Sequence, residues 1–364
     1  MVLNDELTER LNFVRQNLRV WQVDGVLIGS GSNRRWLSSF SGSAGWLLVT
    51  QDKALLGTDF RYWEQATAQA PAFGLFQFQA GKTTWIDLIQ AAGVGRIGLE
   101  ANFVTVAQRE ELDKVDGVSW VNLKSTVELW RRMKSERELT LIRQAAGITD
   151  QVMAQVNGLA RPGQTERQLA WELEKRMREM GASEMAFEVI VASGPHSALP
   201  HHRPGERQLE AGDAIVVDMG AAVDGYRSDL TRSFYLGAEP TEQYWQVYHL
   251  VLAANQKVLA EARPGMTSKA IDALARDLIG AAGHADHFGH GLGHGVGLDI
   301  HEEPRLSPIL EEAVIPAGVI VTVAPGVYLP GWGGVRLEDL TYVTQNGFEA
   351  ISQCPKNPIV SFES

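Results

Sequence analysis

The sequence predicts two domains, an α/β domain at the amino terminus followed by an α+β domain. Short apolar runs alternate with amphipathic stretches in the first third of the chain, and this alternation is typical of layered α/β structure. From residue 127 onward, long helical stretches occur together with strand-like segments in one region, which favours an α+β domain. The length of 364 residues also suits two domains. We expect their limits at residues 1–126 and 127–364.

The first domain contains six expected strands and three expected helices between them. Two patches rich in glycine and serine, residues 30–32 and 41–45, are interpreted as turns because no phosphate-binding motif follows them. The strands are expected at residues 26–28, 46–50, 54–57, 75–78, 96–99 and 118–122, and the helices at residues 62–69, 84–92 and 106–114.

The second domain begins with a long polar segment, residues 127–155, which we interpret as a helical connector because it is poor in glycine. An Arg-Pro-Gly sequence at residues 161–163 interrupts the chain before the next helix. Further helices are expected at residues 165–181, 242–262 and 268–282, and strands at residues 188–192, 214–220, 226–235, 319–323 and 334–343.

The composition is that of a globular protein with a full hydrophobic core, with 45% hydrophobic and 21% charged residues. The 33 basic and 44 acidic residues give a net charge of −11, which argues against nucleic acid as a partner. The single cysteine, Cys354, excludes an intrachain disulfide and a thiolate metal cluster. We expect no membrane segment, no secretion signal and a cytoplasmic location, because no long apolar run and no leader pattern occur.

Two aspartates, Asp218 and Asp229, lie on either side of a predicted hairpin turn at Asp224-Gly225. A turn centred there places residue 218 opposite Thr231, with Asp229 as its diagonal neighbour on the same face. Apolar neighbours indicate that both carboxylates are buried, and burial of two unpaired charges would be costly. A shared divalent cation resolves this repulsion; two aspartates in solvent are the alternative.

Histidines alternate with glycines in the segment GHGLGHGVGLDIH, residues 289–301. His290 and His294 are four residues apart, but the glycines make a helix implausible. We expect an extended or looped segment whose backbone packs closely against another part of the protein, as in a metal or substrate cleft. A flexible surface loop is the alternative.

Two further segments carry polar side chains of interest. Arg336 and Glu338 share one face of a predicted strand, where they form either part of a site or a simple salt bridge. The proline-rich segment ASGPHSALPHHRP contains His196, His201 and His202, which line a pocket or an exposed loop. Three carboxylates with one or more imidazoles suit Mn²⁺, Co²⁺ or Zn²⁺, and a pair of such ions supplies a hydrolytic nucleophile at neutral pH.

These motifs resemble the pita-bread metallopeptidases, in particular the Xaa-Pro dipeptidase (prolidase) and aminopeptidase P group. The resemblance covers nearly the whole chain. SSFSGSAGWLLVT and GTDFRYWEQA are similar to the amino-terminal creatinase-like domain of the group. Six ordered segments are similar to its pita-bread catalytic domain: ASGPHSALPH, VVDMG, SDLTRSF, GHGLGHGVGLDIHE, TVAPGVYLP and GGVRLEDL.

The resemblance implies a set of site residues and two divalent metal ions, with Mn²⁺ expected and Co²⁺ or Zn²⁺ as alternatives. It assigns metal ligands to Asp218, Asp229, His294, Glu338 and position 324. It further implies that His201 and His301 hold the scissile region of the substrate and stabilise the developing oxyanion, and that His290 and Arg336 line or brace the same pocket.

One position departs from the pattern of the group. Residue 324 is alanine in Thr-Val-Ala-Pro-Gly, where the group has a glutamate that is a metal ligand and the usual general base. We therefore expect a weakened metal site and reduced activity. Either the chain is an engineered, substrate-trapping form of an active peptidase, which the intact remaining ligands favour, or it comes from a natural lineage that lost activity.

The expected function is therefore metal-dependent hydrolysis of Xaa-Pro bonds by a cytoplasmic exopeptidase acting on proline-containing di- or oligopeptides. A dipeptidase is favoured, with aminopeptidase P acting on longer peptides as the alternative. A non-catalytic peptide-binding module is supported by Ala324, whereas a metal-free enzyme of the creatinase kind conflicts with the retained ligands. The resemblance also implies a homodimer.

Overall fold

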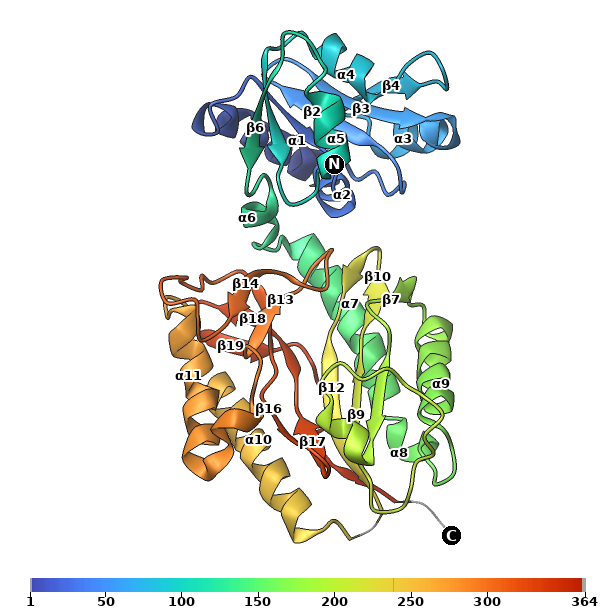
Figure 1. The fold of residues 1–364 in the computed structure, drawn as a ribbon, viewed down its shortest axis with the longest axis vertical. Coiled ribbons are helices and arrows are strands. Elements are labelled where there is room, and N and C mark those ends of the chain that lie inside the picture. Colours follow the sequence, from blue (N-terminus) through green and yellow to red (C-terminus); the bar gives the residue numbers. More distant parts are fainter. Residues whose placement is uncertain (1, 238, 362–364) are drawn as a thin grey trace. The chain divides into compact units, whose positions relative to one another are not determined.

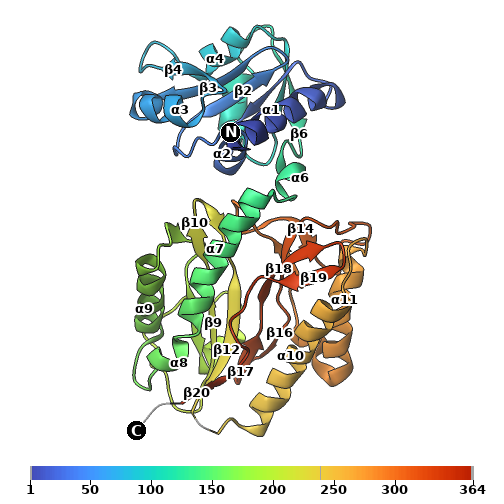
Figure 2. The same cartoon turned by 180° about the vertical axis from the view of Figure 1, so that it is seen from behind.

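The computed structural model describes residues 2–237 and 239–361, and these form two compact units, Met1–Arg131 and Arg132–Ser364. Each unit has its own sheets and its own hydrophobic core, so each is described separately (Figures 1 and 2). Within the described ranges, none of the helices combines the length and apolar character that crossing a bilayer requires.

The amino-terminal unit is built on a six-stranded mixed sheet with the strand order β4-β3-β2-β1-β5-β6. The neighbours β3/β4, β1/β5 and β5/β6 are parallel, whereas β1/β2 and β2/β3 are antiparallel. The strands are β1 (Gly25–Ile28), β2 (Trp46–Thr50), β3 (Ala54–Asp59), β4 (Gly74–Phe78), β5 (Arg96–Glu100) and β6 (Ser119–Leu123).

Helices flank this sheet, and two of the predicted ones begin at Thr84 and Thr105 with capping boxes that satisfy free backbone N–H groups. The interpretation of residues 30–32 as a turn is wrong, because α2 begins at Gly31 and buries Trp36 and Leu37. The helices are α1 (Val2–Val20), α2 (Gly31–Ser38), η1 (Phe60–Tyr62), α3 (Trp63–Gln69), α4 (Trp85–Ala92), α5 (Val106–Leu112) and α6 (Glu128–Arg131).

The carboxy-terminal unit contains two larger antiparallel sheets, with orders β20-β12-β9-β8 and β14-β13-β15-β18-β19, in which only β12 and β20 pair in parallel. Two smaller sheets, β11-β10-β7 and β16-β17, complete it. Its strands are β7 (Glu184–Met185), β8 (Ile190–Ser193), β9 (Ala214–Met219), β10 (Ala221–Val223), β11 (Tyr226–Arg227), β12 (Leu230–Leu236), β13 (Gly293–Gly295), β14 (Glu302–Leu306), β15 (Ile320–Val323), β16 (Gly326–Leu329), β17 (Gly333–Arg336), β18 (Asp339–Thr344), β19 (Gly347–Ala350) and β20 (Ile359–Val360).

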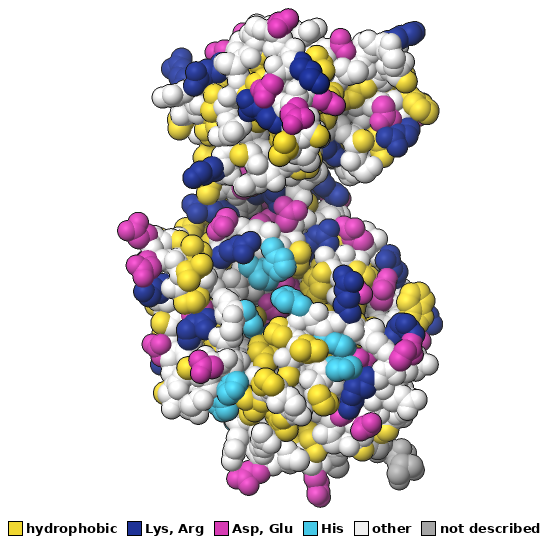
Figure 3. Space-filling model, in the orientation of Figure 1, with side chains coloured by type: hydrophobic (Ala, Val, Ile, Leu, Met, Phe, Trp, Pro, Cys, Tyr) yellow, Lys and Arg dark blue, Asp and Glu magenta, His cyan; other side chains and the backbone are white. Residues whose placement is uncertain are grey.

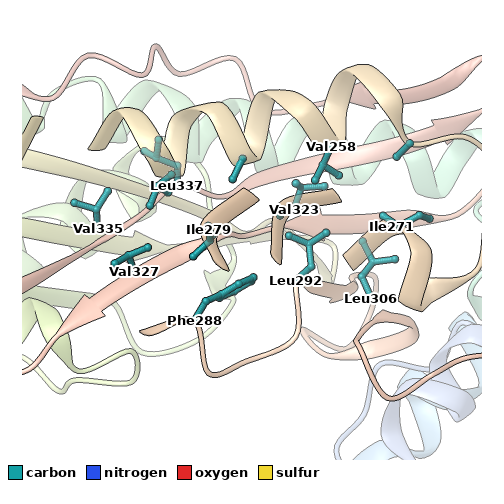
Figure 4. Close-up of a cluster of buried hydrophobic side chains, with 14 of the residues drawn as sticks. Val258, Ile271, Ile279, Phe288, Leu292, Leu306, Val323, Val327, Val335 and Leu337 are labelled. Carbon is teal, nitrogen blue, oxygen red and sulfur yellow. The ribbon is translucent and has the colours of Figure 1, made fainter. Parts of the chain in front are cut away.

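Two groups of helices cover these sheets from outside, α7–α9 beside β9 and β12, and α10 and α11 beside the strands from β13 to β19 (Figures 1 and 2). Each group encloses a separate core, and Figure 4 shows part of the core beneath α10 and α11. The helices are α7 (Glu136–Met153), α8 (Val156–Leu159), α9 (Glu166–Glu179), η2 (Gly194–Ala198), α10 (Glu242–Glu261), α11 (Ser268–Ile279), η3 (Gly280–His284) and η4 (Ala285–His287).

The predicted helical connector at residues 127–155 is not continuous. Helix α6 ends at Arg131, and α7 starts anew after Ser135, whose side chain accepts a hydrogen bond from the Glu138 N–H. The Glu138 carboxylate in turn accepts the Ser135 N–H, so this capping box defines a new helix start. The strand predicted at residues 334–343 is likewise divided between β17 and β18, with the break at Leu337 and Glu338.

Candidate metal centre

A cavity of about 540 Å³ opens in the carboxy-terminal unit, and residues from both larger sheets line it. Histidines gather among hydrophobic side chains on the face of this unit seen in Figure 3. The nine positions to which the family resemblance assigns a role all line this cavity: His201, Asp218, Asp229, His290, His294, His301, Ala324, Arg336 and Glu338. Of the other two histidines named from the sequence, His202 lines it and His196 does not.

The two aspartates are brought together by the hairpin that the sequence predicts. Asp224 and Gly225 have φ angles of 45° and 72°, so both turn residues are left-handed, as a two-residue hairpin turn requires. The register pairs Asp218 directly with Thr231, and Asp229 lies two residues before Thr231. Asp218 and Asp229 are 8% and 4% exposed, so both carboxylates are buried at the cavity wall.

Glu338 reaches the aspartates because the chain between β17 and β18 forms a bridge with Thr231. The Glu338 N–H donates to the Thr231 carbonyl over 3.0 Å. The Thr231 hydroxyl donates to Glu338 Oε2 over 2.8 Å. Thr231 is therefore paired with Asp218 on one side and Glu338 on the other.

His294 lies in the short strand β13, between two glycines that allow the strand to pack closely. A Cβ atom on Gly293 would lie 1.9 Å from the Thr322 carbonyl oxygen, and one on Gly295 would lie 2.5 Å from the Glu303 carbonyl oxygen. Only glycine fits at either position. This confirms the expectation of an extended segment with close backbone packing.

The orientation of the His294 ring suits metal ligation. Its Nδ1 lies 3.1 Å from the Gly295 carbonyl oxygen, which can only accept, so Nδ1 carries the proton. Its Nε2 is then unprotonated and lies 3.5 Å from Asp229 Oδ2. Such a carbonyl contact fixes the tautomer of histidine ligands in metal sites.

Asp229, His294 and Glu338 offer ligand atoms that all lie within 4.8 Å of one another. Burial raises the pKa of Asp229 well above its usual value, and the charges of Glu338 and Asp218 raise it further. Burial likewise raises the pKa of Asp218, to about 6, against the opposing charge of Arg336. Asp218 Oδ1 is buried and has no hydrogen-bond partner within the described part of the chain. These residues fit a divalent cation, which would neutralise the repulsion and use the free oxygen.

Arg336 holds several of these groups in place. It donates from Nη2 to Asp218 Oδ2 over 2.7 Å and from Nε to the Thr231 hydroxyl over 3.1 Å. Its Nη1 donates to the Pro200 carbonyl and to the Tyr328 hydroxyl, both over 3.1 Å. Arg336 therefore connects the Asp218 carboxylate to the loop that carries His201.

The three remaining histidines have different surroundings. His290 uses both ring nitrogens within the protein, Nδ1 toward the Gly291 carbonyl at 2.9 Å and Nε2 toward the Tyr328 hydroxyl at 2.9 Å. Burial lowers the pKa of His290 and of His301 to about 4, so both rings are neutral at pH 7. The His301 ring lies 4.2 Å from the His294 ring, and His201 lines the same cavity.

Ala324 lies directly after β15 and also lines the cavity. Its N–H donates to the Leu292 carbonyl over 2.8 Å, which anchors it beside the segment that carries His294. The residue is buried at 6% exposure and supplies only a methyl group to the cavity wall.

Thr231 and Tyr328 belong to the hydrogen-bond network of the cavity, and sequence reasoning did not identify either as a site residue. Both are buried, and both hydroxyls bond Arg336. The hairpin register places Thr231 opposite Asp218, so the closeness of Thr231 to the site could be predicted from the sequence. Nothing local in the sequence indicates that Tyr328 meets His290 and Arg336.

Comparison with known proteins identifies both parts of the chain. Residues 140–345 match the model of metallopeptidase family M24, and residues 10–133 match the creatinase/prolidase N-terminal domain. The Xaa-Pro dipeptidase of Pyrococcus horikoshii is 33% identical over 98% of this chain and 99% of its own length.

Solved structures of related proteins have the same fold. The Xaa-Pro dipeptidase from Bacillus anthracis superposes with a TM-score of 0.93 at 35% identity, covering 97% of this chain and 99% of its own. The X-Pro aminopeptidase from Thermotoga maritima gives a TM-score of 0.86 at 32% identity, covering 95% and 100%. These matches confirm the predicted α/β amino-terminal domain and pita-bread α+β domain.

Proposed function

The chain belongs to metallopeptidase family M24, and on this premise we propose that it hydrolyses Xaa-Pro bonds as an Xaa-Pro dipeptidase. The observation that carries the proposal is the convergence of Asp218, Asp229, His294 and Glu338 on one cavity. Relatives named Xaa-Pro dipeptidase that align over nearly their whole length support the choice of substrate. Xaa-Pro aminopeptidase is the alternative, since a neighbour of that name aligns equally fully.

Membership of this family implies divalent metal ions, and we propose Mn²⁺, with Co²⁺ or Zn²⁺ as alternatives. Asp229, His294 and Glu338 would hold one ion, and Asp218 and Asp229 would contribute to a second. When bound, such ions lower the pKa of a water molecule and polarise a carbonyl group. Asp218 keeps its orientation through Arg336, whose guanidinium occupies one carboxylate oxygen and leaves the other free.

The histidines divide into two proposed roles. His201 and His301 would contact the substrate, because both line the cavity. Because a neutral His301 ring still carries one N–H group, it can donate a hydrogen bond to a developing oxyanion. His290 would instead brace the pocket together with Arg336, because Tyr328 and Gly291 already occupy its nitrogens.

We propose that Ala324 impairs this activity. No carboxylate is present at this position to accept a proton or to bind a second ion. Loss of a general base alone costs about 10²–10⁴-fold in rate. A non-catalytic peptide-binding protein is a second candidate, because the same methyl group leaves the ligand set incomplete.

The test is to compare this chain with Ala324→Glu after loading each with Mn²⁺ or Co²⁺. Hydrolysis of Xaa-Pro dipeptides and of longer Xaa-Pro peptides is measured, together with bound metal per chain. We expect the substitution to raise kcat by about 10²-fold or more and to increase bound metal. Ala324→Gln, which has similar volume but no charge, is the matched control. If the glutamate variant cleaves neither substrate class, the proposed function is wrong.

Three narrower proposals accompany this function. Preference for dipeptides over longer peptides distinguishes the dipeptidase from aminopeptidase P in the same assay. The homodimer is tested by light scattering over a range of concentrations. The cytoplasmic location is tested by cell fractionation.

A further inference from the structure

A second group of metal-ligating side chains lies outside the ligand set described above. Glu166 is the first residue of α9, His196 lies in η2, and His202 lies in the loop that follows. Their ligand atoms all lie within 4.8 Å of one another. In the described part of the chain, this is the one other group of its kind.

Each imidazole lies beside a different oxygen of the Glu166 carboxylate. His196 Nδ1 lies 3.0 Å from Glu166 Oε1, and His202 Nε2 lies 2.8 Å from Glu166 Oε2. The rings are 4.3 Å apart and inclined by 34°. One carboxylate with two imidazoles is the ligand set of the His₂Glu zinc sites, in which water takes the fourth position. Because tetrahedral bonds of about 2.0–2.2 Å place ligand atoms about 3.3–3.6 Å apart, the two imidazoles would move outward from the carboxylate when an ion binds.

The Glu166 carboxylate is buried and accepts hydrogen bonds from Ser193 and Gly205, with Arg207 close by through its own hydrogen bond to Ser193. Its side chain is fully buried, and its two ion-pair partners are His196 and His202. Burial raises the Glu166 pKa, but hydrogen bonds from His202, Ser193 and Gly205 outweigh that effect and lower it, so the group is ionised at neutral pH. A carboxylate flanked by two imidazoles offers three ligand groups to one cation.

A metal ion can reach this group from solvent. The His196 side chain is 37% exposed and that of His202 is 12% exposed, whereas Glu166 is covered.

We propose that Glu166, His196 and His202 form an additional metal site that binds Zn²⁺. Its ligands are distinct from Asp218, Asp229, His294 and Glu338. The same loop carries His201, which lines the cavity, and Pro200, whose carbonyl accepts from Arg336. A zinc ion bound here would link this loop to the first residue of α9. It would thereby help to hold the loop at the wall of the catalytic pocket.

The test compares zinc content in four proteins by equilibrium dialysis against a series of free Zn²⁺ concentrations, followed by elemental analysis. These are the wild type, His196→Asn, His202→Gln and the control His284→Asn. Asparagine and glutamine keep an N–H donor for Glu166, so the fold is retained, which thermal melting without zinc verifies. The control alters a histidine whose Nδ1 lies 3.2 Å from that of His287 but which belongs to no such three-residue group.

We expect His196→Asn and His202→Gln each to bind one zinc ion fewer per chain than the wild type, and His284→Asn to bind the same number. The catalytic ligands are unchanged in all four proteins, so the difference reports the additional site alone. Anomalous diffraction from zinc-soaked crystals should show a peak between Glu166, His196 and His202. Equal zinc content in all four proteins, or zinc at the catalytic ligands with no peak at Glu166, would overturn the proposal.

Discussion

Thr231 connects the groups of the candidate metal centre through a single hydroxyl. Its Oγ1 donates to Glu338 over 2.8 Å and accepts from Arg336 Nε over 3.1 Å. Its backbone pairs with Asp218 and bridges to Glu338. One uncharged residue thereby sets the relative positions of two carboxylates that repel each other. Outer partners of this kind orient ligands and tune affinity for metal.

We predict that Thr231→Val weakens metal binding by about 10–100-fold and destabilises the fold by about 1–3 kcal/mol. Valine has nearly the shape of threonine but leaves a buried donor on Arg336 and an acceptor on Glu338 without their partner. Isothermal titration with Mn²⁺ and denaturant unfolding measure the two effects.

Thr341→Val is the matched control for this prediction. Thr341 is buried in β18, and its hydroxyl donates to the Val321 carbonyl over 2.7 Å. It does not line the cavity, so its loss should reduce stability and leave Mn²⁺ affinity unchanged. Equal effects of both variants on affinity would contradict a positioning role for Thr231.

At the scale of the element, β13 is a three-residue strand whose glycines decide where His294 lies. β13 is hydrogen-bonded between β14 and β15, and the neighbouring carbonyls leave no room for a Cβ atom. The same backbone contacts place the His294 ring toward Asp229. The glycines beside His294 therefore allow the strand to pack closely against its neighbours. This close packing explains why His290 and His294, although four residues apart, do not lie on a helix.

We predict that Gly293→Ala destabilises the protein by about 1–3 kcal/mol or more and lowers metal content. Its Cβ would lie 1.9 Å from the Thr322 carbonyl, a backbone atom that cannot move without displacing β15. Gly289→Ala is the control, because a Cβ there meets nothing within 4 Å. Thermal melting and elemental analysis of both variants test this, and a Gly293 variant as stable as the control would refute it.

At the scale of the whole molecule, the stability of the carboxy-terminal unit is coupled to the charge of its cavity. Its two cores lie beneath α7–α9 and beneath α10 and α11, and the acidic cluster lies in or next to strands that contribute to these cores. Because burial raises the pKa of Asp218 and Asp229, the metal-free fold favours their protonated forms. Deprotonation then opposes folding, whereas a bound cation needs the deprotonated form.

We predict that the stabilisation by Mn²⁺ increases with pH. The folded pKa of Asp218, about 6, is above its usual value of 3.8, so its contribution to metal-free stability is lost as the pH rises from about 4 to 6. Mn²⁺ binding should therefore raise the melting temperature little at pH 5 and most above pH 7. At 100 times its dissociation constant, the ion adds about 2.7 kcal/mol.

Melting curves with and without Mn²⁺ from pH 5 to pH 8 measure this dependence, with the ion replaced by Ca²⁺ as a control for ionic strength. Asp218→Asn should remove part of the pH dependence of the metal-free protein. A melting-temperature gain that is the same at every pH would show that these carboxylates do not bind the ion.

Much of the candidate site could be predicted because its signals are local. The Asp-Gly turn sets the pairing of Asp218 with Thr231, and the turn residues adopt the left-handed angles that it needs. The ligand roles of positions 294 and 338 and the missing carboxylate at position 324 came instead from the resemblance to a known metallopeptidase group. The predicted domain limits and the roles of the site residues stay predictions.

Hydrophobic periodicity along the chain predicted the α/β and α+β classes of the two domains, and the Asp-Gly turn predicted the register of the Asp218 hairpin, because both signals act over a few residues. The pita-bread fold and the set of residues in the cavity came from the resemblance to a known family. Only the tertiary structure decided the start of α7, the Thr231–Glu338 bridge, the Tyr328 contact with His290 and Arg336, and the Glu166 group. Each of these joins segments far apart in the chain or depends on burial, and the packing of the whole domain sets such contacts.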